Sequence, residues 1–424
     1  MIRIFDSDKW HEIFSALKKN KLRTFFTAFG VFWGIFMLVI MLGSGNGLQN
    51  GVNQGWGDMA TNSMFMWTQQ TTVPYKGFPR GRFFNFKNSD TQALRDNIPE
   101  IQYIAPKIRG WSREGNNNVV RGERTGAFTI EGDYPDFNLI DPVDIISGRF
   151  INDVDIQELR KVAVIGSRVR DEMFTQEEDP IGEYLRIQGV YFQVVGVFKS
   201  KKSDQRAEWD NQIIHLPFTT LQKTYNYGDI VGWYSITSED NAPISLLEVK
   251  AKDLLKSRHN IAPEDDRAIG SFNVEEEFLK MKRLFRGING LIWIVGIGTL
   301  LAGVIGVSNI MLIIVKERTK EIGIQRAIGA TPASIISQVI IESVILTAIA
   351  GYTGLVLGVG LVELVNVILQ QSGDGGGAMF VNPEVDFNMA MRALIILIIS
   401  GIFAGLVPAR RAVSIKPIDA LRDE

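Results

Sequence analysis

Four long apolar segments constrain this chain more than any other feature of its sequence. The first follows Arg23 and contains no charged residue before Asp58, and the third, residues 343–362, is uncharged across 20 positions. A helix of ~20 apolar residues crosses the ~30 Å hydrocarbon core of a bilayer. The sequence therefore predicts an α-helical membrane protein with four transmembrane helices, at residues 24–44, 286–315, 334–369 and 389–408.

Lysine and arginine are distributed unevenly among the segments that flank these helices. Residues 1–23 hold six, 316–333 hold four and 409–424 hold four, whereas 370–388 hold none. Because cytoplasmic loops are enriched in Lys and Arg, both termini and the 316–333 loop are expected in the cytoplasm, and 370–388 on the other side. Residues 45–285 then form a large outside domain, since long segments translocate regardless of charge.

Basic residues precede the first apolar segment, as they do in secretory signal peptides. Its apolar core is longer than the ~7–15 residues of such a signal, and no small-x-small cleavage site follows, so we expect a retained anchor. Within residues 1–23, Trp10, Phe14 and Leu17 share a helical face. This pattern indicates an amphipathic helix lying against membrane lipid or, equally well, the start of an ordinary packed helix.

Glycines recur four residues apart in three of the predicted transmembrane helices. Small residues at this spacing allow two helices to approach closely, which predicts tight packing or dimerisation. The six helix-packing candidates are Gly30, Gly34, Gly354, Gly358, Gly401 and Gly405. Glu342 and Glu363 flank the third apolar segment, and their spacing lets both reach water at opposite interfaces. Ion coupling through an intramembrane carboxylate is the alternative.

Composition excludes several classes of function. The chain has no cysteine, which rules out disulfides and thiolate chemistry. Its formal net charge of −2 gives no reason to expect a nucleic-acid partner. The three histidines are far apart in the sequence, so we expect no metal site, and His215, within "IIHLPF", is expected to be a packed residue.

The outside segment, residues 45–285, alternates short apolar runs with turn signals. Strands are predicted in "KVAVIG", "EYLRIQGVYFQVVGVF", "NQIIHLPF" and "GWYSITS", and helices at 88–98, with Ser89 or Asp90 as a cap, and at 242–260. An α+β domain follows, with a strand-rich inserted lobe at about 110–220. Nothing in it has a catalytic pattern. Its scattered tryptophans are expected to pack in the core.

Two membrane-proximal motifs and one outside motif together resemble a known family. "VKERTKEIGIQRAIGATPASIISQVIIESVILT" and "PARRAVSIKPIDALRDE" are similar to the cytoplasmic loop, third helix and closing motif of the FtsX/MacB family of ABC-transporter permeases. "VAVIGSRVRDEMFTQEEDPIGEYLRIQGVYFQVVGVF" resembles the MacB-type periplasmic core domain. The resemblance implies a homodimer in a bacterial inner membrane, with a porter-like and a strand-rich lobe in the periplasm.

The family docks its ATPase through the loop after the second transmembrane helix. This role carries over onto Glu317, Arg318, Glu321, Ile322, Gly323, Arg326, Ala327, Gly329 and Ala330. Independently of the resemblance, residues 316–328 suit a charged amphipathic helix that stops at Gly329, with Thr331 as a cap and Pro332 starting the next helix. A basic cytoplasmic loop that only fixes orientation is the plainer alternative.

The chain contains no G-x-x-x-x-G-K-[ST] motif, so it does not hold ATP phosphates by that loop. We therefore expect no enzyme activity and no cofactor in this chain, and a separate ABC ATPase subunit that binds ATP and Mg²⁺. The resemblance implies mechanotransmission that drives efflux of drugs, peptides or other periplasmic substrates, with an adaptor and an outer-membrane channel. Lipoprotein release, FtsX-like control of cell-wall hydrolases and a stand-alone membrane receptor are the alternatives.

Overall fold

The structure is a computed structural model that describes residues 21–110, 118–202, 205–371, 380–385 and 387–415. The amphipathic helix expected before residue 21, and parts of the 370–388 loop and of the 409–424 tail, lie outside the described residues. The chain divides into two compact units. A helical unit comprises Met1–Val52, Leu284–Asp374 and Met379–Glu424, and an α/β unit comprises Asn53–Arg283 and Gly375–Ala378.

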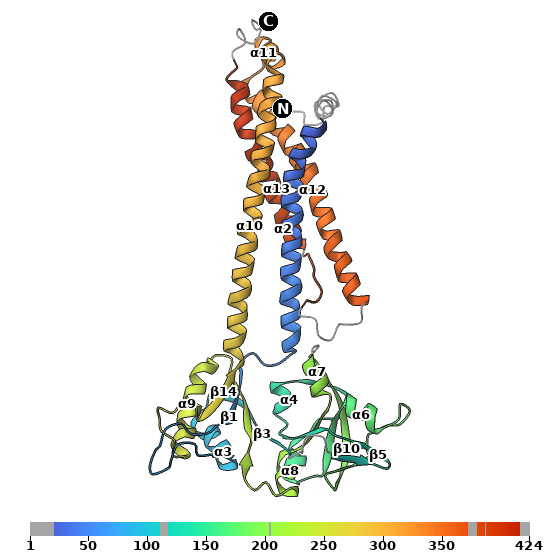
Figure 1. The fold of residues 1–424 in the computed structure, drawn as a ribbon, viewed down its shortest axis with the longest axis vertical. Coiled ribbons are helices and arrows are strands. Elements are labelled where there is room, and N and C mark those ends of the chain that lie inside the picture. The colour runs from blue at the N-terminus through green and yellow to red at the C-terminus, as the bar shows by residue number, and fades with distance from the viewer. Residues whose placement is uncertain (1–20, 111–117, 203–204, 372–379, 386, 416–424) are drawn as a thin grey trace. The chain divides into compact units, whose positions relative to one another are not determined.

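Long helices make up the helical unit (Figure 1). They are α2 (Lys21–Trp56), α10 (Val274–Glu317), α12 (Pro332–Gln371) and α13 (Phe387–Val413), with the short α11 (Thr319–Ala327) between α10 and α12. Within the described part of the chain, the four long helices are long and apolar enough to cross a membrane, which confirms the prediction of four transmembrane helices. With 44 residues, α10 is about 66 Å long, more than twice the hydrocarbon thickness.

Apolar side chains of all four long helices pack together within this unit. One cluster joins Val31 of α2 with Val307 and Met311 of α10, Val339 of α12 and Ala404 of α13. Many Leu, Ile and Val side chains on the other faces are exposed, as expected for surfaces that contact lipid. The inward faces are therefore defined by packing, and the outward faces by the bilayer.

The α/β unit is built on a sheet of 12 strands with the order β14-β1-β13-β3-β6-β11-β8-β10-β9-β4-β5, in which β7 also pairs with β10. The strands are β1 (Ser63–Thr68), β3 (Ile101–Arg109), β4 (Val119–Arg121), β5 (Arg124–Gly126), β6 (Thr129–Asp133), β7 (Val143–Gly148), β8 (Val162–Gly166), β9 (Tyr184–Ile187), β10 (Val190–Ser200), β11 (Ile213–Pro217), β13 (Trp233–Ser238) and β14 (Ile269–Asn273). A second, two-stranded sheet pairs β2 (Phe86–Lys87) with β12 (Ile230–Val231).

All four predicted strand segments are confirmed, and one of them divides in two. The "EYLRIQGVYFQVVGVF" segment forms β9 and β10, because Gln188 and Gly189 both have positive φ, at 46° and 92°, and make a tight hairpin turn. Strand β3 pairs with β13 along residues 101–107 and with β6 at Ile108 and Arg109. Strands β4 to β11 all fall between residues 110 and 220, where the inserted lobe was expected.

The helices of the α/β unit are α3 (Asn88–Asn97), α4 (Phe137–Ile140), α5 (Asp153–Gln157), α6 (Ser167–Met173), α7 (Gln205–Asp210), α8 (Phe218–Thr224) and α9 (Ile244–Arg258). Helices α3 and α9 confirm the two helical predictions. The predicted cap of α3 is wrong, because Lys87 holds the cap position and Asp90 is the third helical residue. The buried Asp90 carboxylate accepts from the Lys87 N–H at 2.9 Å and also contacts Arg258.

Tryptophans occupy less uniform positions than the core interpretation predicted. Trp67 and Trp233 are half-buried, but Trp209 is 76% exposed, so the expectation is wrong for that residue. Trp209 lies in the short helix α7, and Gln212 N donates to its carbonyl as the helix ends. The sheet core instead is formed by aliphatic residues and by phenylalanines such as Phe192 and Phe198.

Candidate functional site

The candidate site is the connection between α10 and α12, residues 316–333. The sequence predicts one helix over residues 316–328. In the structure α10 ends at Glu317 and α11 begins at Thr319, because Arg318 between them has a non-helical conformation, with φ of −95° and ψ of 14°. Backbone hydrogen bonds continue across the break, because Arg318 N donates to Ile314 O and Ile322 N to Arg318 O, both at 3.0 Å. The Thr319 hydroxyl also donates to the Lys316 carbonyl at 2.7 Å, which adds a side-chain hydrogen bond at the boundary between the two helices.

The end of α11 follows the turn chemistry that the sequence indicated. Gly329 has a φ of +107°, the left-handed conformation that ends helices and that glycine adopts without strain. Ala330 N then donates to Gln325 O at 2.9 Å. Thr331 Oγ1 accepts from Ser334 N at 3.3 Å, and Pro332 is the first residue of α12. The position of α11 in the chain is thus fixed sharply at its C-terminal end.

The nine residues predicted to dock an ATPase lie on both faces of this connection. Four of them are exposed: Glu317, Glu321, Ala327 and Gly329. Three are half-buried, Arg318, Arg326 and Ala330, and two are buried, Ile322 and Gly323. Ile322 belongs to the apolar cluster that includes Val315, Ile335 and Ala412. The buried members therefore hold α11 against its neighbours, and only part of the predicted set is available to a partner.

Two exposed isoleucines were missed by the sequence interpretation. Ile324 is 46% exposed and Ile328 is 83% exposed, and together with Lys320 they follow an i, i+4, i+8 spacing. This places them along one side of the connection, together with a charged residue. Two exposed isoleucines four residues apart, next to a charge, are available for an apolar contact with another protein. This spacing could have been predicted from the sequence, because a helix was expected over these residues.

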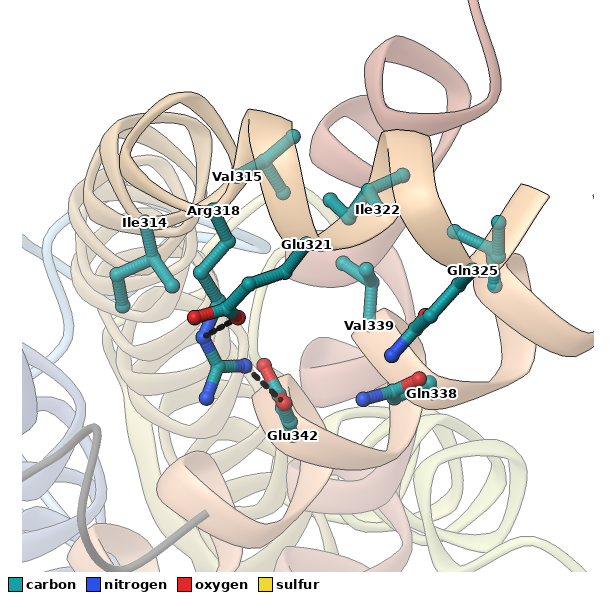
Figure 2. Close-up of a pocket in the computed structure, with 10 residues that line it drawn as sticks. Ile314, Val315, Arg318, Glu321, Ile322, Gln325, Gln338, Val339 and Glu342 are labelled. Atoms are coloured by element: carbon teal, nitrogen blue, oxygen red, sulfur yellow. Dashed lines mark hydrogen bonds and ion pairs between the residues drawn. The ribbon is translucent and has the colours of Figure 1, made fainter. Parts of the chain in front are cut away.

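Arg318 turns inward and makes an ion pair with α12. Its Nη1 donates to Glu342 Oε1 at 2.8 Å, and its Nε lies 3.7 Å from Glu321 Oε2 (Figure 2). The side chains of Arg318 and Glu342 are only 17% and 10% exposed. They border a cavity of about 20 Å³, across which Gln325 and Gln338 point toward each other (Figure 2). The sequence predicts Glu342 at the water interface, and the pairing with Arg318 of the preceding connection is not predicted from it.

Arg326 also turns inward, toward the end of α13. Its guanidinium donates to Val413 O at 2.7 Å and to Ile415 O. Carbonyls at the end of a helix lack helical partners, and the helix dipole favours a cation there. Arg326 therefore caps the C-terminal end of α13.

The six predicted packing glycines all lie where two helices come close. A Cβ at Gly30 or Gly34 would meet α10, and one at Gly354 or Gly358 would meet α2. Gly401 and Gly405 face α12, where the added carbon would lie 2.3 Å from Thr347 Oγ1 and from Ser343 Oγ respectively. These contacts are within one chain.

A buried charged cluster lies at the centre of the α/β sheet. Lys107 Nζ lies 3.0 Å from Glu131 Oε2 and 2.9 Å from Asp133 Oδ1, and His215 Nδ1 lies 2.6 Å from Asp133 Oδ2. Burial raises the pKa of the Glu131 carboxyl, but attraction to Lys107 and His215 outweighs this and holds the pKa well below its usual range. Glu131, Asp133 and His215 could hold a metal ion by spacing, yet the Lys107 ammonium already supplies a cation.

Comparisons with known proteins agree with this architecture. Residues 24–253 match the MacB-like periplasmic core domain, and residues 293–417 match the FtsX-like permease C-terminal region. The chain belongs to the FtsX/MacB family of ABC-transporter permeases. The resemblance found in the sequence is thereby confirmed, and with it a multipass membrane protein that carries a large domain outside the membrane.

Relatives of this permease include longer proteins whose names join an ATP-binding and a permease part. It is 29% identical, over 97% of its length, to the macrolide export ATP-binding/permease protein MacB of Vibrio parahaemolyticus, and covers 60% of that protein. It is 28% identical, over 96% of its length, to the pyoverdine export ATP-binding/permease protein PvdT of Pseudomonas entomophila, and covers 58% of it. The chain thus spans about three fifths of these relatives.

Two solved structures are similar to the outside part of this permease. The periplasmic region of MacB from Actinobacillus actinomycetemcomitans matches 53% of this chain and 94% of its own, at 17% identity and a TM-score of 0.42. The extracellular domain of the transporter YknZ from Gram-positive bacteria matches 50% of this chain and 100% of its own, at 16% identity and a TM-score of 0.40.

Proposed function

We propose that this chain is the permease subunit of an ABC exporter and docks a separate ATPase subunit on the exposed face of α11. The observation that carries the proposal is the row of Lys320, Ile324 and Ile328, with Ile328 83% exposed beside a charged surface. Family membership supports it, because permeases of this family work with an ATP-binding component. ATP and Mg²⁺ would be bound by that partner.

The proposed mechanism is mechanotransmission. Closure of the ATPase displaces α11, and the displacement passes into α10, which is one uninterrupted helix from Val274 to Glu317. That helix contains residues of both compact units, so a rigid shift of α10 reaches the α/β unit. Coupling of this kind requires an element with two discrete arrangements. No substrate path between the transmembrane helices is then needed.

The proposed setting is a bacterial inner membrane, with both termini in the cytoplasm, the α/β unit in the periplasm and two copies of the chain in the complex. Export of drugs, peptides or other periplasmic substrates through an adaptor and an outer-membrane channel completes the proposal. The distribution of Lys and Arg supports the orientation. The names of the relatives, which refer to macrolide and pyoverdine export, support export over lipoprotein release.

The deciding experiment is affinity purification of the tagged full chain in mild detergent, followed by mass spectrometry and an ATPase assay. We expect a subunit with a Walker A motif at near one-to-one stoichiometry and an adaptor at lower yield. Reproducible absence of any ATPase from a preparation that preserves the dimer would overturn the proposal in favour of a receptor without transport.

A further inference from the structure

Helix α11 has little intrinsic means of holding its position. It has nine residues, and isolated helices shorter than ~12–15 residues are marginal in water. Only Ile322 and Gly323 of the helix are buried. If a partner pushes on this helix, the direction in which the force travels depends on what ties it to the rest of the chain.

The described contacts provide a tie at each end of α11, and both ties are arginines. Arg318, at its N-terminal boundary, binds Glu342 of α12 at 2.8 Å. Arg326, in its last turn, binds the carbonyls of Val413 and Ile415 at the end of α13. Such charge-assisted hydrogen bonds are roughly twice as strong as neutral ones, and a guanidinium offers several donors in a fixed plane.

We propose that Arg318 and Arg326 are positioning residues that fasten α11 to α12 and α13, so that these two helices move with α11. The inference rests on the proposed function for the identity of the partner that pushes, but the fastening itself is a property of the permease alone. It assigns the two arginines a role inside the chain, instead of the direct contact with the ATPase that the family motif suggests.

The absence of cysteine allows a direct test in the full chain. Lys320→Cys on α11 and Arg411→Cys in the last turn of α13 are both at exposed positions, so spin labels there report the α11–α13 distance in nanodiscs. When labelled chains are diluted with unlabelled ones, so that only distances within one chain are measured, we expect one narrow distance distribution in the parent. Arg326→Gln should broaden it, and Arg326→Lys should broaden it less, because one ammonium replaces a forked donor.

The second tie is tested with the same label pair. Arg318→Gln and Glu342→Gln should each broaden the distribution, and the exchanged pair Arg318→Glu with Glu342→Arg should narrow it again. Arg392→Gln, which removes an exposed arginine near the start of α13, is the matched control and should change nothing. Parent-like distance distributions in both Arg318→Gln and Arg326→Gln would overturn the inference. It would also be overturned if the exchanged pair kept a broad distribution although size-exclusion chromatography showed that the variant was folded.

A functional readout separates this inference from the docking proposal. In the unlabelled complex, Arg326→Gln should still co-purify the ATPase through Ile324 and Ile328, while permease-dependent stimulation of ATP hydrolysis falls about tenfold. Absence of the ATPase from the parent complex would defeat the docking proposal and leave the distance result intact. Normal stimulation by both Arg318→Gln and Arg326→Gln would defeat the positioning role and leave docking intact.

Discussion

The Arg318 guanidinium and the Glu342 carboxylate meet at 2.8 Å and join the start of α11 to the body of α12. Glu342 stands at the edge of a segment of 20 uncharged residues, where a lone carboxylate would be costly in an apolar environment. With its partner in place, the charge is neutralised locally. The pair thus reconciles a membrane-spanning helix with an ionised residue at its end.

Removal of one member of this pair should destabilise the permease. We expect Arg318→Gln and Glu342→Gln each to cost about 2 kcal/mol, between the values for exposed and fully buried pairs, because the remaining charge loses its partner in a poorly hydrated position. Thermal unfolding in detergent measures the loss. In a double-mutant cycle, the combined variant should lose less free energy of unfolding than the sum of the losses in the two single variants. Additive losses would contradict the pairing of Arg318 with Glu342.

The exposed row on α11 gives a second prediction. Ile328→Asp or Ile324→Asp should abolish recovery of the ATPase, a loss of about 2 kcal/mol or more, because a charge replaces an apolar anchor at the centre of the docking surface. Expression and membrane insertion should remain normal. Lys316→Gln, which removes an exposed charge at the end of α10, is the control and should leave ATPase recovery unchanged. Parent-like recovery from Ile328→Asp would rule out this surface.

Some of these features could be predicted from sequence because they depend on neighbouring residues alone. The length of an apolar run fixes a span, and Gly329 and Pro332 fix the boundary between α11 and α12. The ties of α11 could not be predicted in this way. Arg326 reaches Val413 across 87 residues of chain, and only packing of α11 against α13 brings the two together.

The inward contacts of the two arginines could not be predicted from the motif either. Arg318 pairs with the Glu342 carboxylate, and Arg326 binds carbonyls at the end of α13, and both partners are distant in sequence. The Lys107 cluster gave no local signal either. Its members come from β3, β6 and β11, which are brought side by side only by the order of strands in the sheet.

Two glycines of α12 give a matched pair for testing helix packing. Gly354→Ala should destabilise the permease, because the added carbon would lie 2.6 Å from the Phe32 carbonyl oxygen, a backbone atom that cannot easily move. Gly360→Ala meets nothing within 4 Å and should be neutral or stabilising by up to about 1 kcal/mol, since alanine favours the helix. Equal unfolding temperatures for the two variants would show that α2 and α12 are not in contact.

The buried Lys107 cluster gives a prediction about mutation. Lys107→Met should destabilise the α/β unit by about 3–5 kcal/mol, because it leaves the Glu131 and Asp133 carboxylates buried without their main cation. Lys250→Met is the matched control, since Lys250 pairs with Glu100 in an exposed position, and it should cost less than about 1 kcal/mol. Thermal unfolding of the full chain compares them. Equal effects would mean that the cluster is not a buried ionic unit.

The same cluster predicts how stability depends on pH. The folded-state pKa of Glu131 lies below its ordinary value of 4.5, so its contribution is present above that pH and is lost as the pH falls through the lowered value. Burial lowers the pKa of Lys107, but attraction to Asp133 and Glu131 raises it above 10.5, so its contribution is present below that pH and is lost as the pH rises through the raised value. Both contributions are complete between these limits, and the unfolding temperature should show no step from Glu131 or Lys107 between about pH 5 and 9. EDTA should leave that temperature unchanged, because Lys107 and not a metal ion balances the carboxylates. A fall in unfolding temperature with EDTA, restored by a divalent cation and absent in His215→Asn, would show instead that the cluster holds a metal.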